Sequence, residues 1–144
     1  MSIYSDTVTL FNKKIVDRFQ GPIWYPTVLK NVNLSTDRAV IVAQYGQESG
    51  DKAVLNVRYT KSGDEITVAG KPYMEPKEWD QTEDSLTFAA GDFFWEGEWD
   101  GGIVEDINYT GGFYAYMNEK YDHVFLVTGA AKLTVIPHFE IVGR

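Results

Sequence analysis

The sequence predicts a mainly β protein: a small antiparallel β-barrel or sandwich with one short helix. Short segments rich in β-branched and aromatic residues alternate with turn signals, and aromatic residues make up 15% of the chain, which favours pleated sheets. The stretch Phe93–Trp99 also alternates with the two-residue period of a strand. A chain of 144 residues suits one domain, so we expect residues 1–144 to form a single β-barrel-like domain.

The first half of the chain contains four predicted strands. Thr7–Phe11 alternates β-branched and apolar residues. Ile23–Leu34 is the second strand, in which Pro26 lacks an amide donor and therefore begins the strand, lies at an edge or marks a bulge. Asp37–Tyr45 and Ala53–Thr60 are predicted to pair as an antiparallel hairpin across a polar, glycine-containing loop.

The middle of the chain predicts a short strand, a surface loop and a second hairpin. Ile66–Gly70 is the short strand, and Lys71–Ser85 is predicted to be a loop because it combines two prolines with many charges. Leu86–Trp99 and Ile103–Tyr109 flank the turn signal Asp-Gly-Gly, so we expect them to pair with each other.

The C-terminal part predicts the one helix and two closing strands. Gly111–Asp122 is the helical segment, because its apolar positions at i, i+4 and i+8 fall on one stripe: Phe113, Met117 and Tyr121. His123–Gly129 and Leu133–Gly143 are predicted as strands.

Alternation within Phe93–Trp99 predicts one dry face and one wet face. The residues expected to point inward are Phe93, Trp95, Gly97 and Trp99, a row of rings with a gap at the glycine. Those expected to point outward are Phe94, Glu96 and Glu98. Aromatic rings therefore lie beside carboxylates in the sequence without sharing a face of the strand.

Composition limits the classes of function. The net charge of −8 and the sequence pI near 4.7 argue against wrapping nucleic acid, which requires lysine and arginine to displace counterions. The chain has no cysteine, which excludes disulfides, thiolate chemistry and cysteine-ligated metals. The N-terminal residues lack the pattern of a secretory signal, and no apolar run approaches about 20 residues, so we expect a soluble protein made in the cytoplasm, without membrane contact.

Glu96 and Glu98 raise the hypothesis of a catalytic acid pair. Two residues apart on a strand, their side chains lie about 7 Å apart, within the separation used by inverting glycosidases. A solvated strand face explains the same pattern, and we expect that explanation to hold. A glycosidase remains the less favoured alternative.

The aromatic residues raise the hypothesis of a carbohydrate-binding module. Rings that stack on sugars also serve as core residues, which is their commoner use. The candidates are Trp24, Tyr25, Phe93, Trp95 and Trp99.

Other site chemistry is weakly signalled. His123 and His138 lie 15 residues apart, without the spacing of a metal pair, and there is no glycine-rich phosphate loop or nucleophile elbow. We expect no enzyme activity, no cofactor and no metal.

A polar loop is the candidate interaction element, because loops on rigid β-scaffolds commonly carry function. It consists of Tyr45, Gly46, Gln47, Glu48, Ser49, Gly50, Asp51 and Lys52.

The ordered motifs TVTLFNKK, WYPTVLKNV, PYMEPKEW, LTFAAGDFFWEGE, VFLVTG and HFEIVGR cover most of the chain. In this order they resemble small proteins encoded in the head–tail module of tailed phages and prophages of Gram-positive bacteria, often labelled minor capsid proteins. A recurrent strand of that group is matched here by Leu86, Gly91, Asp92, Gly97 and Glu98.

The resemblance implies a head–tail connector, of the head-closure or stopper type, located at the neck of the virion. Such proteins are β-barrels that form a homo-oligomeric ring of six- or twelve-fold symmetry between portal or adaptor proteins and tail-completion proteins. It implies that the loop Tyr45–Lys52 projects into the channel and contacts packaged DNA without sequence specificity. Trp24, Tyr25 and Trp79 are then the candidate aromatic residues at subunit contacts. Tail completion and capsid decoration stay open as related roles.

Overall fold

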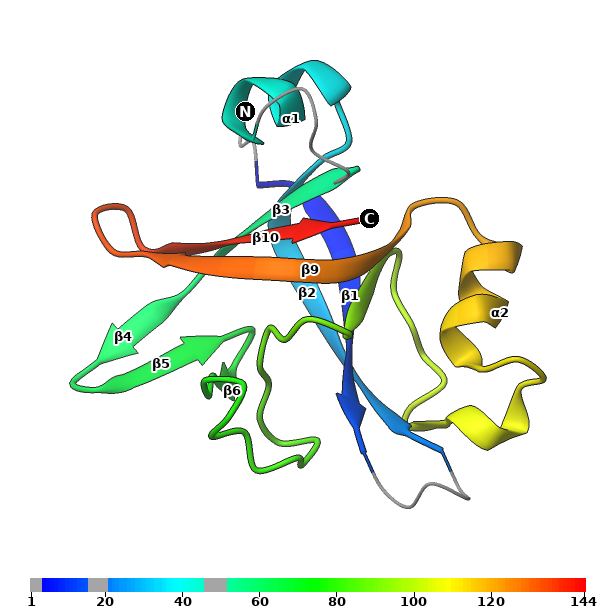
Figure 1. Cartoon of the computed structure of the whole chain (residues 1–144). Coiled ribbons are helices and arrows are strands. Elements are labelled where there is room, and N and C mark those ends of the chain that lie inside the picture. Colours follow the sequence, from blue (N-terminus) through cyan, green and yellow to red (C-terminus); the bar gives the residue numbers. More distant parts are fainter. Residues whose placement is uncertain (1–3, 16–20, 46–51) are drawn as a thin grey trace.

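Six antiparallel strands close into a β-barrel in the computed structural model, which describes residues 4–15, 21–45 and 52–144 (Figure 1). The strand order is β1, β7, β9, β10, β3 and β2, and β2 pairs back onto β1. Their bounds are β1 Asp6–Lys14, β2 Ile23–Ser35, β3 Ala53–Arg58, β7 Phe93–Glu96, β9 Val124–Leu133 and β10 His138–Gly143. The predicted mainly β fold is confirmed, as a barrel.

The long strand β2 closes the barrel because it pairs with different strands at its two ends. Most of β2 pairs with β1, whereas its last residues, Asn33–Ser35, pair with β3. Near its start, β2 also pairs with the two-residue strand β8 (Val104–Glu105). Pro26 lies between these two outer pairings and faces β1 alone, so the missing amide donor removes no ladder hydrogen bond from a second neighbour.

The interior of the barrel is filled by alternate residues of its strands. Val8 and Leu10 of β1, Leu55 of β3, and Phe139 and Ile141 of β10 are at most 1% exposed. Two-residue spacing places such residues on the same face of a strand, so each strand contributes a row to the interior. These rows form the first hydrophobic core.

The segment predicted as the first strand of a hairpin is instead the helix α1 (Arg38–Tyr45). The prediction followed the β-branched residues of Asp37–Tyr45, but Asp37 acts as a helix N-cap. Its carboxylate accepts a hydrogen bond from Ala39 N at 2.9 Å, and its carbonyl accepts one from Ile41 N at 3.2 Å. Ile41 is buried, so local capping and one anchoring side chain outweigh strand propensity.

The predicted hairpin of Leu86–Trp99 with Ile103–Tyr109 is also wrong. Strand β7 pairs with β1 and β9, and β8 pairs with β2. A hairpin forms instead between β9 and β10, because residues 134–137, predicted as strand, make its turn. Lys71–Ser85 is mostly loop, as predicted, after the two-residue strand β6 (Lys71–Pro72).

Strand β7 is buried on both faces, which corrects the prediction for Phe94. Phe93 and Phe94 are both fully buried, on opposite faces of β7. Phe94 enters the barrel core, and Phe93 belongs to a second core outside the barrel. Phe94 and Glu96 lie on the same face of β7, but this face is covered by the barrel interior at Phe94 and is exposed to solvent only from Glu96 onward.

The second core forms where helix α2 (Phe113–Lys120) covers the outside of the barrel, seen at the right of Figure 1. The predicted helix Gly111–Asp122 is confirmed at this place, so the described residues contain two α-helices where one helix was predicted. Phe113 and Met117 are fully buried, and Phe113 packs edge-on against Phe11 at 5.2 Å between ring centroids.

Asp106, in the short 3-10 helix η1 (Asp106–Asn108), holds this second core together. Its Oδ1 accepts hydrogen bonds from Trp24 Nε1 at 3.0 Å and from Phe113 N at 2.8 Å. The second bond satisfies an amide in the first turn of α2, whose N-cap, Gly112, has no side chain to do so. One carboxylate therefore joins β2 to α2.

A three-stranded sheet lies beside the barrel and is made of β4 (Thr60–Ser62), β5 (Glu65–Val68) and β6. The β4–β5 hairpin and the tip of the β9–β10 hairpin extend to the same side of the molecule (Figure 1). The space between these two hairpins contains a hollow.

Candidate functional site

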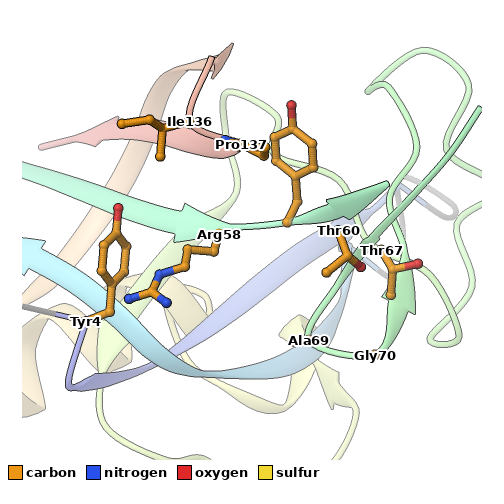
Figure 2. Close-up of a pocket in the computed structure, with 9 residues that line it drawn as sticks. Tyr4, Arg58, Thr60, Thr67, Ala69, Gly70, Ile136 and Pro137 are labelled. Carbon is orange, nitrogen blue, oxygen red and sulfur yellow. The ribbon is translucent and has the colours of Figure 1, made fainter. Parts of the chain in front are cut away.

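A hollow of about 600 Å³ lies between the two projecting hairpins (Figure 2). Thr60, Thr67 and Gly70 line it from the small sheet, and Ile136 and Pro137 line it from the β9–β10 turn. Arg58, at the end of β3, and Tyr4, just before β1, complete the opposite wall (Figure 2). A barrel strand thus positions Arg58, whereas the other side chains come from the small sheet, the β9–β10 turn and the segment before β1.

Arg58 lies over the ring of Tyr4, with its guanidinium carbon 3.9 Å from the ring centroid. A cation over an aromatic face is attracted by the ring quadrupole, and stacking limits the rotation of the long side chain. Within residues 4–15, 21–45 and 52–144, Arg58 forms no ion pair. A partner carboxylate can therefore approach a positioned guanidinium in this otherwise acidic protein.

Tyr59 fixes the base of the β9–β10 turn to the barrel. Its hydroxyl donates a hydrogen bond to the carbonyl of Leu133 at 3.0 Å, and its ring packs against Phe139 at 5.1 Å between centroids. Tyr59 is 7% exposed, so it anchors the hairpin from inside the barrel. The turn beyond it is consequently presented on a fixed base.

The β9–β10 turn is an exposed apolar tip. Val135 is 96% exposed, Ile136 is 70% exposed and Leu133 is 38% exposed. Single exposed apolar residues are ordinary, but three close together at the end of a projecting hairpin form a patch typical of protein contacts. We call Leu133–Pro137 the apolar tip.

The predicted channel loop falls mostly outside the described residues. Gly46–Asp51 lie outside them, and Tyr45 is the last residue of α1. Lys52 is exposed, and its amide donates to the carbonyl of Gly143 at 2.7 Å, which attaches this end of the loop to β10. The contact of the loop with DNA stays a prediction.

The three predicted subunit-contact aromatics occupy different environments. Trp24 is 3% exposed within the second core, so its ring is not on the surface of the subunit. Tyr25 and Trp79 are half-buried and pack edge to face, with centroids 6.2 Å apart. Trp79 Nε1 is buried without a hydrogen-bond partner among the described residues. The structure brings Tyr25 and Trp79 together, and their role in a subunit contact stays a prediction.

The two glutamates of the opening strand face solvent, as predicted. Glu96 Oε2 lies 3.2 Å from His123 Nδ1, and Glu98 Oε1 lies 3.6 Å from Lys30 Nζ. Both pairs are exposed, so each contributes little to stability. The carboxylates point to different partners and not into a shared cleft, which disfavours the acid-pair hypothesis. Nδ1 of His138, the other histidine, donates a hydrogen bond to the carbonyl of Ile136, 2.6 Å away.

The glycine gap in the predicted row of rings is occupied by a neighbouring indole. A Cβ on Gly97 would lie 2.5 Å from Cζ2 of Trp95, so the ring of Trp95 folds over the glycine. Trp95 also packs against Tyr121 at 4.9 Å, and Trp99 Nε1 donates to the carbonyl of Gly102 at 2.9 Å. Both tryptophans are half-buried at the border of the second core.

A buried carboxylate near the end of β1 was not predicted as a site. Asp92 is 3% exposed and accepts hydrogen bonds from Asn12 Nδ2 at 2.9 Å, Lys13 N at 2.9 Å and Ala89 N at 3.2 Å. Burial raises the pKa of Asp92 to about 6, and the bonds from Lys13, Asn12 and Ala89 oppose that rise. The Gly91-Asp92 pair in the recurrent strand motif was the sequence signal for it.

Sequence reasoning also missed Arg58, Tyr4 and the apolar tip. Arg58 and Tyr4 are 54 positions apart in the sequence, and no local pattern joins them. The apolar tip was not predicted because the pattern of Leu133–Gly143 is that of one continuous strand. The sequence signal for a turn here was Pro137, which follows three apolar or β-branched residues and cannot donate an amide hydrogen bond to a neighbouring strand.

One family of known sequences matches almost the whole chain. Residues 3–144 match the family described as "Family of unknown function (DUF6751)". The chain belongs to this family. No curated protein and no solved structure matches the chain.

In the described part of this DUF6751 chain, no helix is long and apolar enough to span a membrane. The same residues contain no group of three or more histidine, cysteine, aspartate or glutamate side chains arranged to hold a metal ion.

Proposed function

We propose that this DUF6751 protein is a non-enzymatic structural protein of a tailed-phage virion, a subunit of the head-closure or stopper ring at the neck. The observation that carries the proposal is the exposed apolar tip beside the hollow lined by Arg58 and Tyr4, on a closed barrel. Exposed apolar residues, tyrosine and arginine are enriched at protein–protein contacts. The order of the sequence motifs supports the assignment to the neck.

The barrel suits a load-bearing assembly subunit. Closure leaves few long strand edges, so contacts with neighbours concentrate on the projecting hairpins. The net charge of −8 suits a channel through which DNA slides, because few lysines and arginines are available for counterion-releasing contacts.

Co-expression with portal-type and tail-completion proteins of a tailed phage tests this proposal. Mass photometry and negative-stain electron microscopy should show the protein added to a ring, and the variants Arg58→Glu and Ile136→Asp should weaken that addition at least about tenfold. Lys61→Glu, an exposed change on the neighbouring strand β4, is the matched control. Failure of the wild-type protein to join any ring, together with its absence from purified virions, would reject the proposal.

A carbohydrate-binding module is the second candidate, because Trp95 and Tyr121 form a half-buried ring pair at the surface. Its test is a tryptophan-fluorescence titration with oligosaccharides. Binding that is lost in Trp95→Ala without unfolding would favour the module, and an unchanged spectrum across the panel would dismiss it.

A further inference from the structure

The outer edge of β9 offers an unpaired stretch of backbone. Strand β7 pairs with β9 from Val124 to Leu126, and the segment Gly91–Asp92 then takes over at Val127 through hydrogen bonds of 3.2 and 2.8 Å. No described strand pairs with the outer side of Gly129–Leu133. An open edge of this kind is a template for a further strand.

The direction of the free backbone groups follows from the register. Arg144 and Leu126 exchange both backbone hydrogen bonds, at 2.9 and 2.8 Å. Alternate residues of β10 therefore face β9, and Glu140 is one of them, opposite Ala131. Ala131 consequently turns its amide and carbonyl towards β10, whereas Ala130 and Lys132 turn theirs to the open edge.

We propose that two copies of this chain pair antiparallel along this edge, with the two-fold axis at Ala131. A two-fold axis normal to the sheet keeps each side chain on its own face, and residues that pair across the axis must share a face. The axis therefore lies between a residue and its own copy and not between two successive residues. Ala131 is the central residue of the open stretch Gly129–Leu133. Ala130 of one copy then exchanges both backbone hydrogen bonds with Lys132 of the other. Ala131 lies directly opposite its own copy.

A second copy is the occupant that the charges favour. The stretch Gly129–Pro137 carries one charged residue, Lys132, in a chain of net charge −8. Two such chains repel each other over much of their surface, but not here. In the proposed register Lys132 lies opposite Ala130, so like charges are not opposed. The small side chains of Gly129, Ala130 and Ala131 let the two edges approach.

The same register gives the apolar tip a place to bind. Beyond Leu133, the tip of one copy runs alongside Val127 of the other, where Gly91 and Asp92 already occupy the edge. Val135 and Ile136 thereby reach the hollow of about 340 Å³ that Gly91 lines together with Ile15 and Trp79. The surface that is most exposed in one copy is covered by the other.

The ion pair between Lys132 and Glu75 does not oppose this contact. The distance between Lys132 Nζ and Glu75 Oε1 is 3.7 Å and both side chains are exposed, so the ion pair contributes little to stability. Backbone pairing at Lys132 also leaves its side chain on the face where Glu75 lies. The proposal depends on the geometry of β9 and not on a role in the phage neck.

Charge variants at the axis test the proposal on the isolated protein. Sedimentation velocity should find a dimer of the wild type, and Ala131→Lys or Ala131→Glu should each raise the dimer Kd at least about tenfold, because two like charges then face each other across the axis. A one-to-one mixture of the two variants should restore the dimer. Thr110→Lys and Thr110→Glu, at an exposed turn, are the matched controls.

A single cysteine gives an independent test, because the chain has none of its own. In the proposed register the two Ala131 Cα atoms form a non-hydrogen-bonded pair, about 4.5 Å apart, which a disulfide can bridge. Ala131→Cys should therefore cross-link quantitatively under mild oxidation, whereas Thr110→Cys should not.

Circular dichroism of each variant establishes that it is folded. A monomeric wild type, a folded Ala131→Lys variant that stays dimeric, or equal cross-linking at residues 110 and 131 would overturn the proposal. Each of these outcomes concerns the isolated chain, so it is separate from the failure of ring assembly with portal-type partners.

Discussion

The indole of Trp24 and the carboxylate of Asp106 are joined by a hydrogen bond of 3.0 Å between residues 82 positions apart. The same carboxylate oxygen accepts from Phe113 N, so one atom connects the start of β2 with the start of α2. Trp24 is 3% exposed, which means that its N–H has no access to water as an alternative partner. A single side chain therefore links the helix to the barrel by hydrogen bonds, beside the packing of Phe113 and Met117 in the second core.

Asp106→Ala is expected to lower the free energy of unfolding by about 2–4 kcal/mol, because it removes a helix cap and leaves a buried indole N–H unsatisfied. Asp106→Asn keeps an oxygen at the accepting position and should cost less than half as much. Urea denaturation followed by tryptophan fluorescence measures both, with exposed Asp122→Ala as the control. Equal effects of the alanine and asparagine variants would contradict this account of the carboxylate.

Asp92 should make the protein less stable as the pH rises. Its pKa is about 6 in the folded state, raised by burial from the ordinary value of 3.8. The stabilisation from this group is then complete below about pH 4 and is lost as the pH rises through 6, a total of about 3 kcal/mol.

The difference in unfolding free energy between wild type and Asp92→Asn isolates this effect from the other carboxylates. We expect that difference to shift against the wild type by about 3 kcal/mol between pH 4 and pH 8. The exposed variant Asp64→Asn should show no such shift. A difference that moves in the opposite direction would mean that the three donors around Asp92 outweigh its burial.

Phe93→Ala and Phe94→Ala should be similarly damaging, although the strand period alone assigns Phe94 to solvent. Both side chains are fully buried, so each truncation is expected to cost about 3–5 kcal/mol. Glu96→Ala, on the same strand and exposed, should change stability by less than about 0.5 kcal/mol. Chemical denaturation of the three variants checks the prediction. A loss of unfolding free energy at Phe94→Ala that is much smaller than at Phe93→Ala would show that the barrel interior does not require that ring.

Gly97→Ala should displace the indole of Trp95. The added Cβ would lie within 2.6 Å of Cζ2 and Cη2 of the ring, and the backbone at Gly97 has φ +157°. We expect a red-shifted tryptophan emission and a loss of about 1–3 kcal/mol of stability. Gly63→Ala is the control for a positive φ, at +62°, with nothing within 4 Å of the added methyl group. An identical effect at both glycines would assign the cost to the backbone and not to the ring.

The predictable part of the fold was the part governed by local pattern. The run of β-branched and apolar residues in β1 and the stripe of Phe113 and Met117 in α2 are local signals, and both elements were placed correctly, although Val8–Asn12 of β1 is buried on both faces. Pattern failed where two faces are buried, at Phe94, and where a cap competes with strand propensity, at Asp37. The sequence Ser35-Thr36-Asp37 before an apolar run was the overlooked sign of a helix start.

The candidate site was less predictable, because distant segments build it. Arg58 meets Tyr4 only once the barrel has formed, and Ile136 reaches the same hollow from the C-terminal hairpin. The exposed glutamates were predicted correctly from a single strand, since their neighbours along the chain determine which face they take.

Pairing of β3 with the last strand, from Ala53 opposite Gly143 to Arg58 opposite His138, has a consequence for biosynthesis. During translation, the strand that pairs with β3 is synthesised about 85 residues after it. Until then, the unpaired edge of β3 and the apolar residues of the barrel interior are exposed to solvent. Nascent chains stalled before His138 are therefore expected to be prone to aggregate or to recruit chaperones.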